Sequence, residues 1–158
     1  MLMATMILIV SLALFFFYIQ VTCQRILRRR FDKEYYQVIV SANRLEFLSV
    51  RQTLEEFDSS VDYARVRMTL KCDYLALTYL LKHAANFKQR YSRDELLMIF
   101  HFRAALLFLL VRHALKLKEK PAILRLTAVL QYFANVVGQR VSQIRFGDPS
   151  ATDYLMNI

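Results

Sequence analysis

Residues 6–23 read MILIVSLALFFFYIQVTC, and this uncharged stretch decides the fold. No Asp, Glu, Lys or Arg occurs before Arg25. As a helix, residues 1–23 would be about 35 Å long, enough to cross the hydrocarbon core of a bilayer, which is about 30 Å thick. A helix satisfies its backbone polar groups internally, as a segment in lipid must. We therefore expect residues 1–24 to form a single transmembrane anchor.

A cleaved signal peptide is the alternative interpretation of this leader. Such a peptide has a positively charged start and a small-residue cleavage site. Residues 1–6 contain no Lys or Arg, and no Ala-x-Ala-like site follows the apolar run. Thr22 before Cys23 is also a poor context for lipoprotein processing. The sequence therefore favours a retained anchor.

The segment that follows, residues 25–34, is a basic juxtamembrane segment. Its basic residues are Arg25, Arg28, Arg29, Arg30 and Lys33. Lys and Arg close to the end of a membrane span mark its cytosolic side. We therefore expect a single-pass protein with its N-terminus outside and its body in the cytosol.

The body is predicted to be all-α. The chain has two Gly and two Pro, so turn residues are scarce and long helices are favoured. Apolar residues recur at helical spacing over 31–57, 60–87, 93–117 and 121–146. Similar lengths and short connections predict an up-down-up-down four-helix bundle within residues 35–146. Residues 147–158 are expected to form a flexible C-terminal tail.

Local signals support these boundaries. Ser92 and Glu95 fit a capping box that opens the third helix. Pro121 suits the first turn of the fourth helix, and Gly147 a stop after it. In the first body helix, Asn43 is the one polar member of an otherwise apolar seam, where such a residue sets register or lies at the rim.

The segment 96–111, LLMIFHFRAALLFLLV, is apolar on all sides and allows two interpretations. It is short for a second membrane span, and Arg103 lies at its middle. Such a charge costs about 3 kcal/mol at the bilayer centre, which several Leu and Phe offset. The capping box before it and the amphipathic helices around it favour a buried bundle helix.

The formal net charge of +9 attracts either anionic lipid or nucleic acid. An up-down bundle would return Lys88, Arg90 and Arg93 to the membrane side, beside the basic juxtamembrane segment. We expect these residues to contact lipid headgroups, with the basic end of the bundle facing the membrane. Nucleic acid is disfavoured because most aromatic residues fall at core spacings instead of alternating with basic ones.

Motifs of catalysis or cofactor binding are not found in the sequence. There is no Gly-rich phosphate loop, no His-Glu-x-x-His and no Cys-x-x-Cys. His83, His101 and His113 are isolated, and Glu55, Glu56, Asp58 and Asp62 lack the spacing of a calcium loop. We expect no catalytic, cofactor or metal site, and Cys23 and Cys72 are not expected to form a disulfide.

Hydrophobic residues make up 56% of the chain, which leaves apolar surface for lipid or protein partners. We expect a non-catalytic, membrane-anchored helical interaction protein, an accessory or scaffold subunit of a larger membrane complex. Homo-oligomerisation is compatible with this expectation. Two other classes stay open: a haem-binding electron carrier that uses His101, and a membrane tether for nucleic acid.

Overall fold

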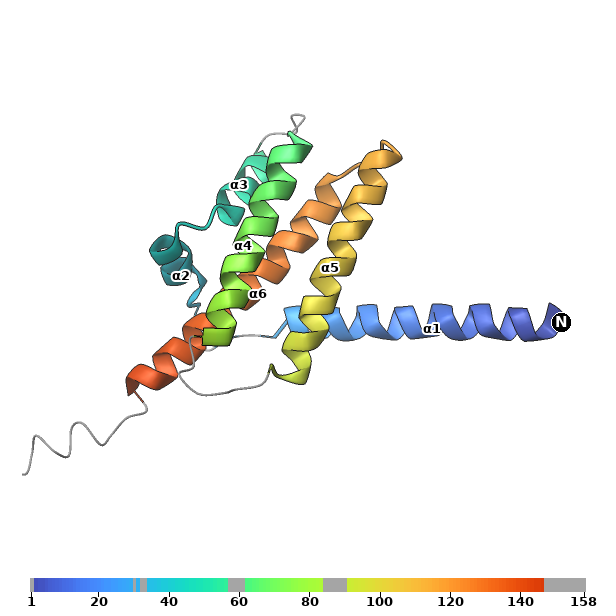
Figure 1. The fold of residues 1–158 in the computed structure, drawn as a ribbon, viewed down its shortest axis with the longest axis horizontal. Helices are drawn as coiled ribbons and strands as arrows, with labels where there is room; N and C mark the ends of the chain where they lie inside the picture. Colours follow the sequence, from blue (N-terminus) through green and yellow to red (C-terminus); the bar gives the residue numbers. More distant parts are fainter. Residues whose placement is uncertain (1, 30, 32–33, 57–61, 84–90, 147–158) are drawn as a thin grey trace, which may run out of the picture.

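The computed structural model describes residues 2–29, 31, 34–56, 62–83 and 91–146, and within these ranges it contains six helices and no strand (Figure 1). The expected all-helical class is confirmed. The helices are α1 (Leu2–Leu27), α2 (Tyr36–Asn43), α3 (Phe47–Glu56), α4 (Tyr63–His83), α5 (Arg93–Ala114) and α6 (Lys120–Phe146).

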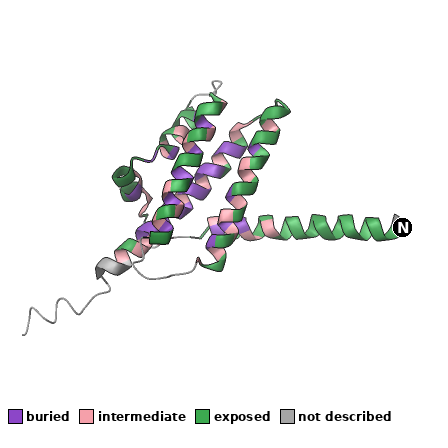
Figure 2. Cartoon of the chain, in the orientation of Figure 1, coloured by how far each residue is buried: buried purple, intermediate pink, exposed green. Residues whose placement is uncertain are grey.

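The first helix, α1, projects from a body formed by the other five (Figure 1). Apart from Ile19, its large apolar side chains are exposed from Met3 to Val21, and Figure 2 shows this length almost entirely as exposed. Only its last turns join the body, where Cys23 and Ile26 are buried and α1 packs against α5 and α6. Among the described residues, α1 alone is long and apolar enough to cross a membrane.

The last helix, α6, lies at the centre of the body, because α2, α3, α4 and α5 all pack against it. Its apolar residues recur every three or four positions, which places them along a broad stripe of the helix. The buried members of this stripe are Ala122, Ile123, Leu126, Val129, Leu130, Phe133, Ala134 and Val137.

The single helix expected over 31–57 is wrong: α2 ends at Asn43 and α3 begins at Phe47. Arg44 adopts the left-handed conformation (φ 51°, ψ 43°), and its N–H donates to the carbonyl of Val40. The Asp73 carboxylate of α4 then accepts hydrogen bonds from the N–H groups of Glu46 (3.0 Å) and Phe47 (2.7 Å). It satisfies the free donors of a new helix N-terminus, so the chain can start again in another direction.

The other boundaries follow the sequence more closely. Ser92 and Glu95 form the expected capping box, in which the N–H of Ser92 donates to the Glu95 carboxylate at 3.0 Å. Pro121 stands in the first turn of α6, as expected. At the start of α4, the carboxylate of Asp62 accepts from the N–H of Ala64 at 3.0 Å, so Asp62 caps the helix from just before its first turn. The connection expected at 58–59, most of the one expected at 88–92 and the tail 147–158 lie outside the described residues.

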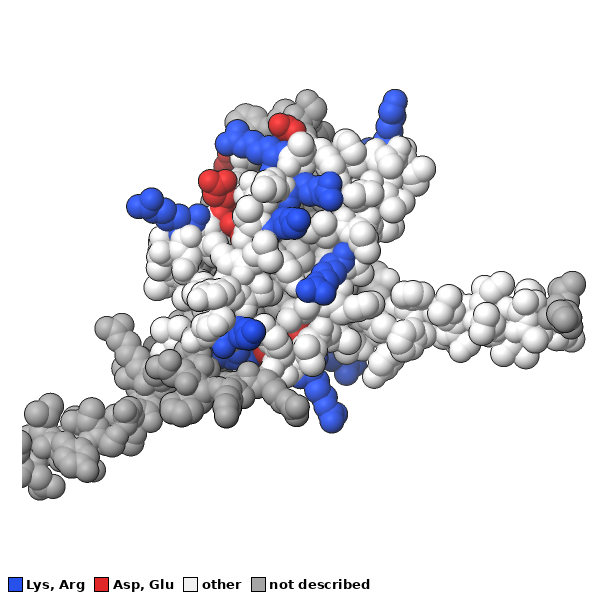
Figure 3. All heavy atoms as spheres, viewed as in Figure 1, with Lys and Arg blue, Asp and Glu red and all other residues white. Residues whose placement is uncertain are grey.

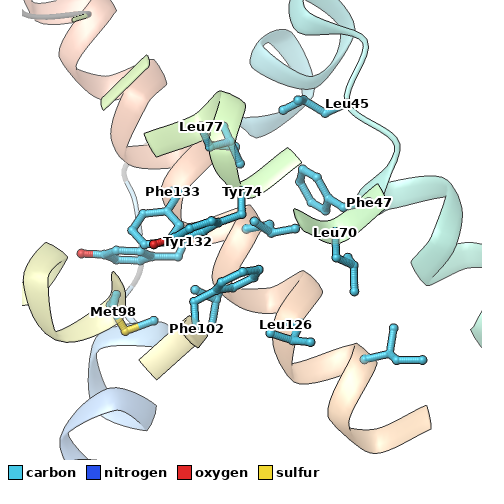
Figure 4. Packing of buried hydrophobic residues seen from close by; sticks show 14 of the residues in the cluster. Leu45, Phe47, Leu70, Tyr74, Leu77, Met98, Phe102, Leu126, Tyr132 and Phe133 are labelled. Atoms are coloured by element: carbon cyan, nitrogen blue, oxygen red, sulfur yellow. The ribbon is translucent and has the colours of Figure 1, made fainter. Parts of the chain in front are cut away.

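The core lies between α3, α4, α5 and α6 (Figure 4). At its centre the ring of Tyr74 from α4 stacks on that of Phe102 from α5, with centroids 4.2 Å apart and planes 5° from parallel. Phe133 of α6 meets Tyr74 at 6.3 Å, so three helices share one aromatic cluster. This cluster holds α5 on α6, and these are the two helices that meet α1.

Candidate membrane-proximal site

The C-terminal end of α1 connects the apolar helix to the body. Its last turns pack against α5 and α6, and Cys23 is fully buried there. Leu27 and Phe31 lie partly buried against the same core. Of these, Cys23 would belong to a discarded leader, so a leader residue contributes to the packing of the folded body.

The structure describes four of the eight residues expected to face lipid headgroups. Arg25 lies in the last turn of α1, and Arg28 and Arg29 directly follow it, all three exposed. Arg93 is exposed at the first position of α5. Arg30, Lys33, Lys88 and Arg90 lie outside the described residues.

Two of the expected basic regions meet at a hollow of about 190 Å³ between the end of α1, the start of α5 and α6. Arg29 lines it from one side, and Asp94, the neighbour of Arg93, lines it from another. The end of α1 and the N-terminus of α5 thus lie side by side at this hollow. A second hollow of about 410 Å³ adjoins the first and shares Arg29, Phe31 and Tyr132 with it.

A buried ion pair forms the inner wall of the first hollow. Arg140 of α6 donates from Nη2 to Oε1 of Glu95 at 2.5 Å and from Nη1 to the carbonyl oxygen of Leu81 at 2.8 Å. The two side chains are 15% and 6% exposed, so the pair is largely removed from water. Because Arg140 bonds to both α4 and α5, it ties three helices together at the end where α1 arrives.

The phenol of Tyr132 lies at the same place. Burial, followed by the nearby carboxylates of Asp94 and Glu95, raises the pKa of Tyr132 to about 12. Its hydroxyl therefore stays neutral at physiological pH. The ring packs on that of Phe31, with centroids 5.8 Å apart, and so holds the segment after α1 against α6.

Sequence reasoning missed the pairing of Glu95 with Arg140 and the capping of α3 by Asp73. A signal was present, because Asp73 lies three residues after Leu70 and four before Leu77, on the apolar face of α4. Arg140 likewise follows Val137 by three residues on the apolar stripe of α6. A charged residue at a core position needs a hydrogen-bonding or oppositely charged partner, but the sequence does not identify that partner.

The three histidines occupy separate environments. His83, at the end of α4, contacts the carbonyl of Tyr79 at 2.8 Å, and His113 pairs with Glu119 at 2.5 Å while stacking on Tyr63. His101 is half-buried in α5, and burial, reinforced by Arg125, lowers its pKa. In the part of the chain that the structure describes, no three His, Cys, Asp or Glu residues gather as metal ligands would.

The outward face of α5 is an unexpected feature. Its inward face contributes Met98, Phe102 and Leu109 to the core. Its opposite side carries exposed apolar residues along nearly the whole helix, namely Leu96, Phe100, Leu107, Phe108 and Val111. The segment 96–111 thus belongs to a helix, α5, that the body covers on one side only.

Charge is distributed very differently over α1 and the body. Figure 3 shows basic and acidic side chains over the body, whereas the exposed length of α1 carries neither. No family model, curated protein or solved structure matches this chain.

Proposed function

We propose that the protein is a non-catalytic, membrane-anchored helical interaction protein, an accessory or scaffold subunit of a larger membrane-associated complex. The observation that carries this proposal is the exposure of α1. Burying one large apolar side chain is worth about 1.5–3 kcal/mol. Summed over the exposed side chains between Met3 and Val21, this exceeds the about 5–15 kcal/mol that stabilises a typical domain. The helix therefore requires an apolar medium outside the chain.

A bilayer is the medium that fits the dimensions of α1. Its 26 residues give a helix about 39 Å long, enough to cross a hydrocarbon core about 30 Å thick. The burial of Cys23 and Ile26 against the body supports a retained anchor over a cleaved signal peptide, because cleavage would uncover their neighbours. Arg25, Arg28 and Arg29 directly beyond the span support a cytosolic body.

For the body, we propose a four-helix bundle whose first member is broken into α2 and α3. Central packing on α6 supports this interpretation. The basic residues at the junction, including Arg29 and Arg93, would face the headgroups of anionic lipids. Exposed apolar residues elsewhere on the body, such as Met68, Leu75 and Tyr79 of α4, are surface that a protein subunit would cover.

The anchor is tested by washing membranes that contain the full-length chain with alkaline carbonate, then measuring its intact mass and N-terminus. We expect the chain to pellet with residue 1 or 2 at its start. Leu12→Arg should reduce the pelleted fraction, because a charge at the bilayer centre costs about 3 kcal/mol, whereas Leu12→Ala should not. A mature chain that begins near residue 24, or wild type in the supernatant, would refute the anchor.

The interaction role is tested on the same membranes after extraction in a mild detergent. The proposal predicts a complex of defined stoichiometry, heavier than one 18.7 kDa chain with its detergent, that survives dilution. Light scattering with chain-resolved mass spectrometry measures both properties. A monodisperse single chain would contradict an accessory or scaffold role while leaving the anchor intact.

A further inference from the structure

We propose that the outward face of α5 lies on the surface of the same membrane that α1 crosses, so that the body rests on its side against the lipid. This inference rests on the proposed anchoring by α1. It assigns to α5 the role of an interfacial helix, which neither spans the bilayer nor stands clear of it.

The first argument is the composition of α5. Leu96, Phe100, Leu107, Phe108 and Val111 of the outward face are 49–64% exposed. Spacings of four, seven and four residues put Leu96, Phe100, Leu107 and Val111 on one stripe. Leu115 and Leu117, just beyond the helix, extend the exposed apolar surface. A helix that is apolar on all sides is normally covered on all sides, and here the body covers only one.

The second argument is the direction in which α1 leaves the body. Figure 1 shows α1 running across α5 and away from the body on the side where α5 is the outermost helix, with α2 and α3 on the other side. If α1 stands along the membrane normal, α5 then lies close to the membrane plane. Since α5 packs its inward face on α6, its outward face is turned away from α6, toward the lipid.

The third argument is the position of the charges on α5. Its only acidic residues are Asp94 and Glu95 in the first turn, and Glu95 is buried in the pair with Arg140. Arg103 stands within the exposed stripe, where its long side chain can reach the headgroups while its methylene groups stay among apolar neighbours. The guanidinium of Arg112 lies 5.3 Å from the ring centroid of Phe108. Cations interleaved with apolar side chains are typical of helices that lie in an interface.

Lipid is favoured over a second copy of the chain for two reasons. A symmetric dimer through this face would bring Arg103 and Arg112 of both copies into one apolar interface. The exposed stripe of α5 supplies no carboxylate to pair with them, so the like charges there are costly. In addition, once α1 is inserted in the bilayer, it holds α5 next to the membrane. The face therefore meets lipid at a high effective concentration without any further association step.

The test uses tryptophan, because the chain has none of its own. Phe100→Trp and Leu107→Trp report on the outward face, Met68→Trp on an exposed position of α4, and Leu12→Trp on the span. Each full-length variant is reconstituted in phosphatidylcholine vesicles with a minor fraction of phosphatidylglycerol. Lipids brominated at defined acyl positions quench the emission of a tryptophan at that depth, and circular dichroism confirms the helical fold of each variant.

We expect bromines near the headgroup end to quench Phe100→Trp and Leu107→Trp, bromines near the chain end to quench Leu12→Trp, and Met68→Trp to be spared. Quenching of Leu12→Trp alone would overturn the inference and leave the anchor standing, whereas an unquenched Leu12→Trp would refute the anchor itself. If Phe100→Trp and Leu107→Trp are shielded from aqueous acrylamide yet not quenched by brominated lipid, protein covers this face and the inference is wrong. Quenching of both by bromines near the chain end would show that α5 enters the bilayer core, which also contradicts it.

Discussion

Two helices of nearly equal length, α1 with 26 residues and α6 with 27, have opposite surroundings. The more apolar of the two, α1, is exposed along most of its length, while α6 carries several basic residues and is surrounded by four other helices. Apolar content alone therefore does not place a helix inside a protein. A helix is buried only where other helices of the chain pack against it. For α1 this happens only at the last turns.

The largest effect is expected where α6 buries a charge. Arg140→Ala would leave Glu95 without its partner, and breaking a largely buried ion pair costs about 3–5 kcal/mol. Denaturant unfolding of the body in detergent, followed by circular dichroism, measures this loss. Replacing both residues by Met should cost less, because no unpaired charge then remains and only the hydrogen bonds to Ser92 and Leu81 are lost. Equal losses in the single and double variants would contradict the account of the pair.

Leucine substitutions compare α1 and α6 directly. Leu126 of α6 is fully buried, so Leu126→Ala should lower the free energy of unfolding by about 2–5 kcal/mol. Leu12 of α1 is 56% exposed and lies far from the junction, so Leu12→Ala should leave the stability of the body unchanged. Thermal unfolding of both variants in the same detergent provides the comparison. A similar loss in both would mean that α1 packs along the body.

The close packing of the start of α2 on α6 is expected to depend on Gly138. A Cβ at this position would collide with the Cβ of Tyr35, just before α2. Overpacking of this kind costs about 1–3 kcal/mol, which outweighs the about 1 kcal/mol that Ala gains over Gly in a helix. Gly138→Ala should therefore destabilise the body in denaturant unfolding, whereas Gln139→Ala beside it should change little. A stabilised Gly138→Ala variant would show that α2 does not pack closely there.

A smaller effect is expected at Asp73, where two substitutions separate the cap from its charge. Asp73→Ala removes the acceptor for Glu46 and Phe47 and should cost about 1–3 kcal/mol. Asp73→Asn keeps an oxygen acceptor and should retain most of the stability. Unfolding in denaturant measures both variants, and losses of equal size would contradict the capping role.

The same residue predicts a pH dependence. Burial raises the pKa of Asp73 above its ordinary value of 3.8, more than the hydrogen bonds from Phe47 and Glu46 lower it. The folded state then holds the proton more firmly than the unfolded state. The contribution of Asp73 to the free energy of unfolding is therefore complete below pH 3.8. It is lost as the pH rises through the pKa that Asp73 has in the folded state. Because Asn does not titrate, the stability of Asp73→Asn relative to wild type should increase as the pH rises from acidic to neutral. A decrease would refute the raised pKa of Asp73.

Sequence reasoning predicted the features that depend on neighbouring residues. The apolar α1, the capping box of Ser92 and Glu95 and the position of Pro121 each rest on a short stretch of chain. The break between α2 and α3 was missed because Asp73, which caps α3, lies 26 residues beyond Phe47 in another helix. Arg140 and Glu95 are 45 residues apart, so their pairing was equally hidden.

The outward face of α5 was missed for a related reason. Periodicity shows that a helix is apolar on two sides but does not show which side the body covers. The direction of α1 relative to the body depends on how Cys23 and Ile26 pack on α5 and α6, which no local pattern encodes. Basic residues at one end predicted a body standing on that end, whereas we propose that the body rests on the membrane along α5.

Thiol labelling tests the central claim most directly, namely that α1 crosses a membrane and leaves the body on the cytosolic side. Cys72 is exposed on α4, while Cys23 is buried, so the folded chain offers one accessible thiol. A membrane-impermeant maleimide is applied to intact cells and to permeabilised cells, with Cys72→Ser as the control for labelling at Cys23. The account predicts that Cys72 is labelled only after permeabilisation, in a chain that stays in the membrane pellet. Labelling of Cys72 in intact cells would contradict it.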